Sequence, residues 1–278
     1  MESTQSRTNF NNIFIVADDL GLDPAVNRGI FFAFKNSLIG GASLMANGVA
    51  FEDAVRQCLE VNFSNIGVHL VLVEEKSLLS PEKIPTLVNK DGLFYKNHRI
   101  FFIRYILGLI KKDQIKEEME AQINKCIAAG IRPKFINSHQ HLHLLPGILD
   151  VVISLAKKYG IFYVRIVHEP FRTNGSIFRM AQLCFLRFLS RMAKKKIIQN
   201  GLKCNDFFVG FINAGNLSID DINLAKKLQN KYPNKFIELG CHPGFESSVM
   251  VEKYRHWGYN WQKELEILEK GRNHYEKV

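Results

Sequence analysis

The chain has 278 residues, a formal net charge of +10 at pH 7 and a hydrophobic fraction of 46%. This composition excludes a disordered chain, which would contain fewer hydrophobic residues. A chain of this length can form one α/β barrel, and we expect a single domain over residues 1–278. The five cysteines are widely spaced without a C-x-x-C pair, which argues against a disulfide framework and predicts a reducing, cytoplasmic location.

Two segments are the candidates for a secretory signal and for a transmembrane helix. Residues 1–12 are polar and lack the apolar stretch of a secretory signal. The most apolar run, residues 100–110, is interrupted by Arg104 and is shorter than the about 20 residues that cross a bilayer. We therefore expect no membrane-spanning helix.

Short β-rich apolar runs alternate with helical patterns along the chain. The expected strands cover residues 12–17, 42–46, 66–72, 135–139, 162–167, 207–212 and 236–241, and the expected helices cover 24–36, 51–60, 114–129, 146–159, 219–231 and 260–271. This alternation predicts parallel β-α units in a barrel or a doubly wound sheet, with catalytic residues at the carboxyl ends of the strands. Segments 74–113 and 171–204 break the alternation and are expected to be insertions that border the site.

Four expected strands deliver a carboxylate or an imidazole at their carboxyl ends. Asp18 and Asp19 follow the first strand, His69 lies in the third, His139 ends the fourth and His242 follows the last. Each residue alone has a structural explanation, such as a helix cap, a turn or a buried histidine. Together, one carboxylate and two imidazoles would form a metal site with open positions, and a second carboxylate could act as a general base.

Three alternating histidines strengthen the metal hypothesis. His139, His141 and His143 would project to one side of an extended strand, because strand side chains alternate with a period of two. Such a cluster favours metal binding over a structural polar group. If this segment is a loop, we expect one or two of the three to be ligands.

The ordered motifs Asp-Asp-x-Gly, Gly-x-His-Leu, Ser-His-x-His-x-His and Cys-His-Pro-Gly, between residues 13 and 244, resemble those of the YdjC-like carbohydrate deacetylases. The resemblance implies an irregular (β/α) barrel of about seven parallel strands, related to polysaccharide-deacetylase-type barrels. It also implies a hydrolase that removes acetyl groups from amino sugars with one divalent metal ion, Mg or Zn.

The same resemblance implies roles for five residues. Asp19, His69 and His139 are similar to the metal ligands of the family, and Asp18 is similar to its general base. His242 would protonate the leaving amine or donate a hydrogen bond to the developing oxyanion.

Two further positions bear on this site. Arg165 is similar in placement to the arginine that orients the base aspartate. Asn137 stands where family members often carry Asp, two residues before His139. An amide can hydrogen-bond a ligand but adds no negative charge, so we expect an effect on metal affinity or on the tuning of His139.

The excess positive charge is concentrated in one segment, which has no acidic residue between Glu169 and Asp206. Its eight basic residues are Arg172, Arg179, Arg187, Arg191, Lys194, Lys195, Lys196 and Lys203. Residues 176–196 predict an amphipathic helix whose apolar side contains Phe178, Ala181, Phe185, Leu186, Phe188, Leu189 and Met192.

Two interpretations of this helix remain open. The favoured one is that the apolar side covers the barrel while the charges are solvated. The alternative is that the helix lies on an anionic membrane at its inner face, which would suit a lipid-linked sugar. Nucleic-acid binding ranks third because no aromatic platform or known reader motif accompanies the charge.

The sequence favours hydrolysis of the N-acetyl amide of an amino sugar, in an oligosaccharide or a lipid-linked glycan, by metal-activated water. A metal-dependent phosphoester hydrolase is an alternative, because metal-water chemistry does not fix the bond that is attacked. A non-catalytic basic protein that binds membrane or nucleic acid is a third. A homodimer is compatible with the sequence, although no motif indicates one.

Overall fold

The computed structural model describes residues 13–172 and 176–273. The expectations for residues 1–12, including the first residue of the first strand, lie outside these ranges, as do residues 173–175 of the basic segment. None of the helices in these two ranges has the length and hydrophobicity of a transmembrane segment.

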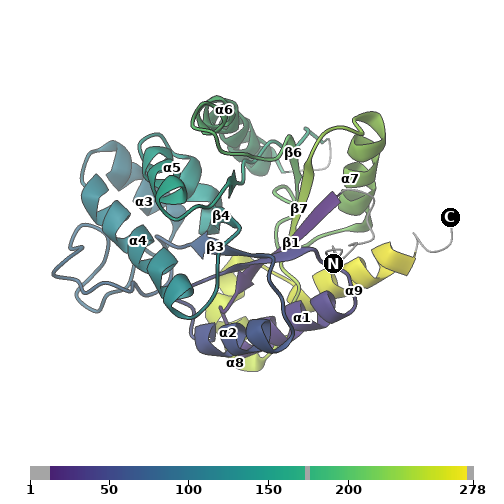
Figure 1. The fold of residues 1–278 in the computed structure, drawn as a ribbon, viewed down its shortest axis with the longest axis horizontal. Coiled ribbons are helices and arrows are strands. Elements are labelled where there is room, and N and C mark those ends of the chain that lie inside the picture. The colour runs from purple at the N-terminus through teal and green to yellow at the C-terminus, as the bar shows by residue number, and fades with distance from the viewer. Residues whose placement is uncertain (1–12, 173–175, 274–278) are drawn as a thin grey trace, which may run out of the picture.

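Among the described residues, seven parallel strands form one curled sheet in the order β5-β4-β3-β2-β1-β7-β6. Their bounds are Ile13–Leu20 (β1), Gly41–Leu44 (β2), Ile66–Leu70 (β3), Phe135–Ser138 (β4), Tyr163–Val164 (β5), Phe207–Val209 (β6) and Ile237–Cys241 (β7). Helices surround the strands (Figure 1). The predicted irregular (β/α) barrel is therefore confirmed.

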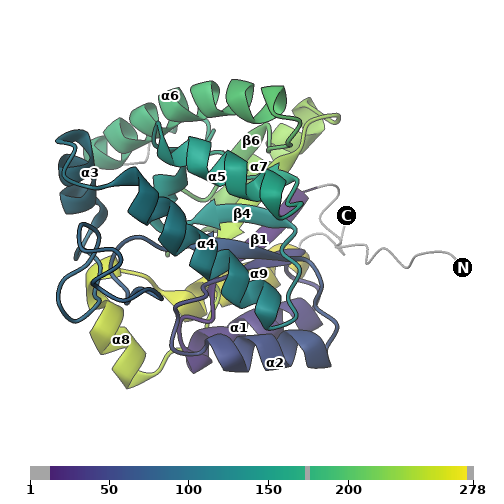
Figure 2. The ribbon, with the colours of Figure 1, turned by 60° about the vertical axis from the view of Figure 1, so that its left-hand side comes forward.

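Helices α1 to α7 lie between successive strands, and α8 and α9 follow the last strand. They are Pro24–Lys35 (α1), Phe51–Glu60 (α2), His98–Ile106 (α3), Lys112–Ala128 (α4), Ile148–Lys158 (α5), Ile177–Gln199 (α6), Ile219–Lys231 (α7), Ser248–Tyr254 (α8) and Trp261–Asn273 (α9), with short 3₁₀ turns over His139–Leu144 (η1) and Arg255–Trp257 (η2). Figure 2 shows α4 beside α5 and α1 beside α2 on the outer face.

The six helices predicted between the strands and after the last one agree with α1, α2, α4, α5, α7 and α9 to within two residues at each end. Helices α3 and α8 were not predicted. The start of α3 is marked by Asn97, whose side chain accepts hydrogen bonds from the backbone N–H groups of Arg99 and Ile100.

The basic segment forms helix α6, but its buried side differs from the one expected. The buried residues are Leu183, Leu189, Ser190, Ala193 and Ile197. Phe178, Phe185, Phe188 and Met192, which we expected to cover the barrel, are exposed. The favoured interpretation of this helix is therefore wrong for these four residues, because a different face of α6 packs against the barrel.

The centre of the barrel is polar at the carboxyl ends of the strands. The buried polar side chains there are Asp18, Asp19, Ser43, His69, Asn137 and Arg165, and the buried Glu238 lies near the start of β7. The register of the sheet places His69 of β3 directly beside Asn137 of β4. Buried groups of this kind are stable only when they are paired, so their contacts define the site.

The side-chain amide of Asn205 connects β5 and β6, the two edge strands of the sheet. Asn205, which is fully buried, accepts a hydrogen bond from the Ile166 N–H (2.8 Å) and donates one to the Ile166 carbonyl (2.7 Å). The Phe208 N–H also donates to the His168 carbonyl, at 3.2 Å. The chain after β5 is thus connected to the start of β6, and the amide of Asn205 replaces a backbone partner.

We expect Asn205→Ala to lower the free energy of unfolding by about 2–4 kcal/mol, because the buried N–H and C=O groups of Ile166 lose their partner. Urea denaturation measures this change. Asn230→Ala, at an exposed position of α7, is the matched control and should change stability by about 0.5 kcal/mol or less. Equal stability of the two variants would show that the amide does not hold the edges together.

Candidate metal and catalytic site

The polar strand ends open into a cavity of about 590 Å³, a size typical of small-molecule sites. Asp18, His69, His139 and His242 all line it. Further wall residues come from the loops after β3 and β6, from the first turns of α3 and α6, and from η2. Residues of both predicted insertions therefore border this cavity.

An irregularity at the end of β1 directs two successive carboxylates into the barrel. The pairing of β1 with β2 shifts register between Ala17 and Leu20, and Asp19 has a left-handed φ of 64°. Regular strand side chains would alternate between the two faces. The shift instead leaves both Asp18 and Asp19 buried beside the cavity.

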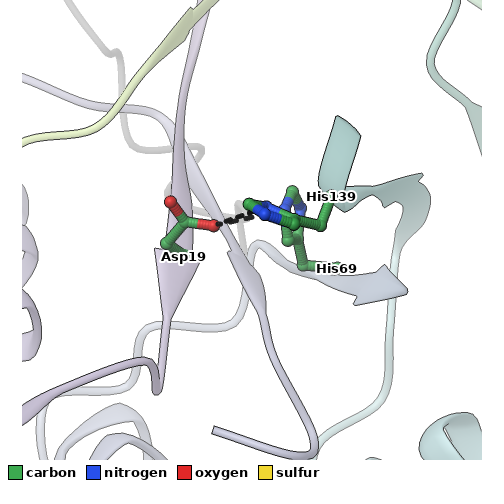
Figure 3. Close-up of side chains that lie close together, drawn as sticks. All are labelled: Asp19, His69 and His139. Carbon is green, nitrogen blue, oxygen red and sulfur yellow. Dashed lines mark ion pairs between the residues drawn. The ribbon is translucent and has the colours of Figure 1, made fainter. Parts of the chain in front are cut away.

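Asp19, His69 and His139 come together as a group that could hold a metal ion, with one ligand atom from each residue lying within 4.8 Å of the others. In Figure 3 the two imidazoles point toward the carboxylate of Asp19. His69 Nε2 and His139 Nδ1 lie 3.3 and 3.7 Å from Asp19 Oδ1. Neither buried oxygen of Asp19 accepts a hydrogen bond within the described residues, which fits a cation as its partner.

Hydrogen bonds orient both imidazoles. His69 Nδ1 lies 2.8 Å from the Asn137 amide oxygen, which can only accept, so Nδ1 carries a proton and Nε2 is the nitrogen that faces Asp19. His139 Nε2 lies 2.7 Å from a carboxylate oxygen of Glu74. Burial opposes the charged form of His139, but Asp19 and Glu74 raise its pKa to about 10. A cation would therefore displace a proton from Nδ1.

Asn137 acts on a different histidine from the one we expected. Its amide oxygen contacts His69, and its amide nitrogen donates to Asp18 Oδ1 at 3.0 Å. The expectation that this position tunes His139 is wrong, because the register of β3 and β4 places Asn137 beside His69. A carboxylate here would place a second negative charge next to Asp18.

Asp18 is held by a buried arginine. Arg165 donates from both terminal nitrogens to Asp18, at 2.5 and 2.9 Å, and its Nε donates to Glu238 at 2.5 Å. Ser43 Oγ also donates to Asp18 Oδ1, at 2.7 Å. Burial would raise the pKa of Asp18, but the positive charge of Arg165 holds it well below its usual range.

His242 has the electrostatic environment of an acid. Burial favours its neutral form, but Glu264, Asp19 and Asp18 raise its pKa above the usual value. Its Nδ1 lies 3.7 Å from a carboxylate oxygen of Glu264, and its backbone N–H donates to the same group. Its ring lies 4.6 Å from that of Tyr259.

The other two histidines of the triplet lie outside the metal group. Strand β4 ends at Ser138, and Gln140 and His141 adopt left-handed backbone angles, so the expected alternation ends at His139. His141 lines the cavity. His143 contacts Ser138 Oγ (2.7 Å) and the Arg165 carbonyl (2.8 Å), and burial lowers its pKa to about 4.

Sequence reasoning missed several residues that support this site. Glu74 and Glu264 contact His139 and His242, and Glu238 binds Arg165. Glu238 had a detectable signal, since it is the one charged residue in an otherwise apolar strand. Glu74 follows β3 at the start of a long irregular segment, where no periodicity assigns a direction to a side chain.

Comparison with known proteins agrees with this geometry. The model of the YdjC-like protein family matches residues 12–274. The chain belongs to this family. A carbohydrate deacetylase of Clostridium beijerinckii is 28% identical over 252 residues, which cover 91% of this chain and 89% of that protein.

Other relatives carry the same name. A carbohydrate deacetylase of Thermoanaerobacter pseudethanolicus is 30% identical over 200 residues, covering 71% of this chain and 68% of that protein, and one of Homo sapiens is 28% identical over 247 residues, covering 84% and 75%. The family resemblance predicted from the sequence is confirmed, and with it the expectation of an enzyme of the carbohydrate-deacetylase class.

A solved structure from Enterococcus faecalis, named for cellobiose-phosphate cleavage, has the same fold. Its TM-score is 0.72 at 23% identity, and the match covers 95% of this chain and 94% of that chain. At this level of identity the likeness establishes the fold.

We expect Asn137→Asp to destabilise the protein by about 2 kcal/mol at pH 8, because two carboxylates would meet at about 3 Å. Their mutual repulsion raises a carboxyl pKa in the folded state, so the loss of stability should shrink as the pH falls toward 5. Urea denaturation at both pH values measures it. Asn137→Ala is the control, and its loss should not shrink in this way. A pH-independent loss in Asn137→Asp would contradict the proximity of the two charges.

Proposed function

We propose that this protein is a metal-dependent hydrolase that removes the N-acetyl group from an amino sugar, in an oligosaccharide or a lipid-linked glycan. The observation that carries the proposal is the convergence of Asp19, His69 and His139 on one point, next to Asp18 and in the same cavity as His242. The carbohydrate deacetylases of Clostridium beijerinckii and Thermoanaerobacter pseudethanolicus support the reaction class.

One divalent cation would be held by Asp19, His69 and His139. When bound, such a cation polarises a carbonyl group and makes a coordinated water more acidic. Two imidazole nitrogens and one carboxylate suit zinc better than magnesium, which prefers oxygen ligands. The described residues contain one such group, which favours amide hydrolysis over a phosphoester hydrolase with two metals.

Asp18 would take the proton of the attacking water. Its paired Arg165 keeps it ionised, which is the form that accepts a proton. Asp18 Oδ1 already accepts hydrogen bonds from Ser43, Asn137 and Arg165, whereas Oδ2 accepts one, from Arg165. Oδ2 therefore retains a lone pair for this transfer.

His242 would supply the proton that the leaving amine needs, or donate a hydrogen bond to the oxygen of the acetyl group. Its raised pKa favours the protonated imidazolium, and the carboxylate of Glu264, 3.7 Å from Nδ1, stabilises that charge. Asp18 and His242 would thus form a base and an acid whose environments shift their pKa values in opposite directions. This arrangement allows both proton transfers near neutral pH.

The cavity walls suit a sugar. Phe211, Trp257 and Tyr259 offer aromatic faces, and Asn213 and Asn216 add polar groups. Apolar ring faces combined with a few polar groups match the mixed surface of a pyranose. A cytoplasmic location belongs to the same proposal and is supported by the five free cysteines.

Asp18→Asn should lower the rate of acetate release from an N-acetylated disaccharide at least about 100-fold, because it removes the base and preserves its shape. The variant should still bind the cation, because the residue at position 18 is not one of the three that form the metal group. A coupled acetate assay measures the rate, and circular dichroism checks the fold, since Arg165 loses a charged partner. Unchanged turnover in a folded variant would contradict the role of Asp18.

Adding zinc to chelator-treated protein should raise its Tm by about 5 °C or more, because the folded state alone assembles the three ligands. Asp19→Asn should abolish most of this rise. His141→Gln is the matched control, since His141 lines the same cavity outside the metal group, and it should keep the rise. Equal losses in both variants would contradict the assignment of the ligands.

A further inference from the structure

Helix α6 presents a second apolar stripe that the barrel does not cover. Phe178, Phe185 and Met192 recur every seven residues and therefore lie along one side of the helix. They are 52%, 43% and 53% exposed, and Phe188 next to them is 60% exposed. Side chains of this size are normally buried in a folded protein when they form a contiguous group.

Helix α3 extends this stripe. The rings of Phe102 and Phe185 meet edge-on with centroids 5.6 Å apart, and the guanidinium of Arg99 lies 4.6 Å from the centre of the Phe178 ring. Ile106 follows Phe102 by one helical turn and is 64% exposed. In Figure 2 the two helices lie side by side at one end of α6. We call the exposed residues Ile103, Ile106, Leu107, Phe178, Phe185, Phe188 and Met192 the α3–α6 surface.

The charges on these two helices have one sign. Neither α3 nor α6 contains an acidic residue. Lys194 and Lys196 form ion pairs with Asp206 and Asp150. Arg191 and Lys195 are exposed and form no ion pair within the described part of the chain. A positively charged apolar surface is complementary to an anionic lipid bilayer.

The same charges argue against a second copy of the chain as the partner that covers the α3–α6 surface. A two-fold contact places identical patches against each other. The contact would bring basic residues of the two copies together, including the exposed Arg191 and Lys195, with no carboxylate on either helix to compensate.

The α3–α6 surface adjoins the cavity. The first turns of α3 and α6 contribute Arg99, Phe178 and Arg179 to the cavity wall. Phe178 belongs both to this wall and to the exposed stripe. Phe178 thus links the wall of the cavity to the α3–α6 surface.

We propose that the α3–α6 surface docks on an anionic lipid membrane, and that the amino sugar is presented to the cavity on a membrane lipid. The lipid part of this inference rests on the proposed function. Docking itself depends only on the exposed apolar side chains and on Arg191 and Lys195.

Co-sedimentation of the full chain with vesicles tests the docking. The protein should bind vesicles of phosphatidylcholine and phosphatidylglycerol, bind phosphatidylcholine alone weakly, and be released by salt. Phe185→Ser/Phe188→Ser and Arg191→Gln/Lys195→Gln should each weaken binding about tenfold or more. The control Leu59→Ser/Val249→Ser removes exposed apolar side chains of α2 and α8 and should bind as the wild type does.

Two results overturn the docking. One is the absence of binding to anionic vesicles at low ionic strength. The other is a dimer in analytical ultracentrifugation that Phe185→Ser/Phe188→Ser dissociates, which would identify a second copy as the occupant.

Activity separates the docking from the proposed function. Acetate release from a soluble N-acetylated disaccharide should be equal in wild type and Phe185→Ser/Phe188→Ser, because neither residue lines the cavity. Release from N-acetylglucosamine coupled to a dialkylglycerol in anionic vesicles should fall about tenfold in that variant. If the wild type and this variant release acetate from the vesicle substrate at equal rates, the proposal that a membrane lipid carries the sugar is wrong. No release from either substrate by the wild type would refute the proposed function, and the vesicle binding would still decide the docking.

Discussion

The buried guanidinium of Arg165 is the constraint on which the structure depends. It is fully buried and lies between two carboxylates, those of Asp18 and Glu238. In the sheet order, β5 and β1 are four positions apart, which would separate them by about 19 Å in a flat sheet. The ion pair between Arg165, just beyond β5, and Asp18 of β1 is therefore possible only because the sheet curls. The curvature of the sheet therefore brings the two partners of this ion pair together.

The same ion pairs limit which further charge the site can accept beside Asp18. Removing one member of a buried ion pair costs about 3–5 kcal/mol, because the remaining charge loses its partner. Asp18 and Glu238 already share the single charge of Arg165. The uncharged amide of Asn137 fits between Asp18 and His69, since it donates to one and accepts from the other. A carboxylate at this position would need a further cation or a proton.

The sequence predicted the parts of the site that parallel strands impose. Asp18, Asp19, His69 and His242 could be brought together in advance because the carboxyl ends of parallel strands meet. The sequence did not show that the chain turns at Gln140 and His141, because neither residue is a glycine that signals left-handed angles. Nor could it assign Asn137 to His69, because that pairing depends on the register between β3 and β4. The contact between Glu74 and His139 comes from an irregular segment. No periodic pattern in the sequence shows where a side chain of such a segment points.

Several of the arginines in the basic segment bind to other parts of the protein and are not free on its surface. Arg172 joins Glu169 to Asp221, Arg179 donates to the Phe211 carbonyl and Arg187 donates to the Glu169 carbonyl. These contacts fasten α6 to the barrel and use much of the charge that suggested a polyanionic partner. What remains exposed on the helix is largely apolar. Because the first turn of α6 is also a wall of the cavity, the contacts that fix the helix place its exposed stripe at a constant position relative to the metal group.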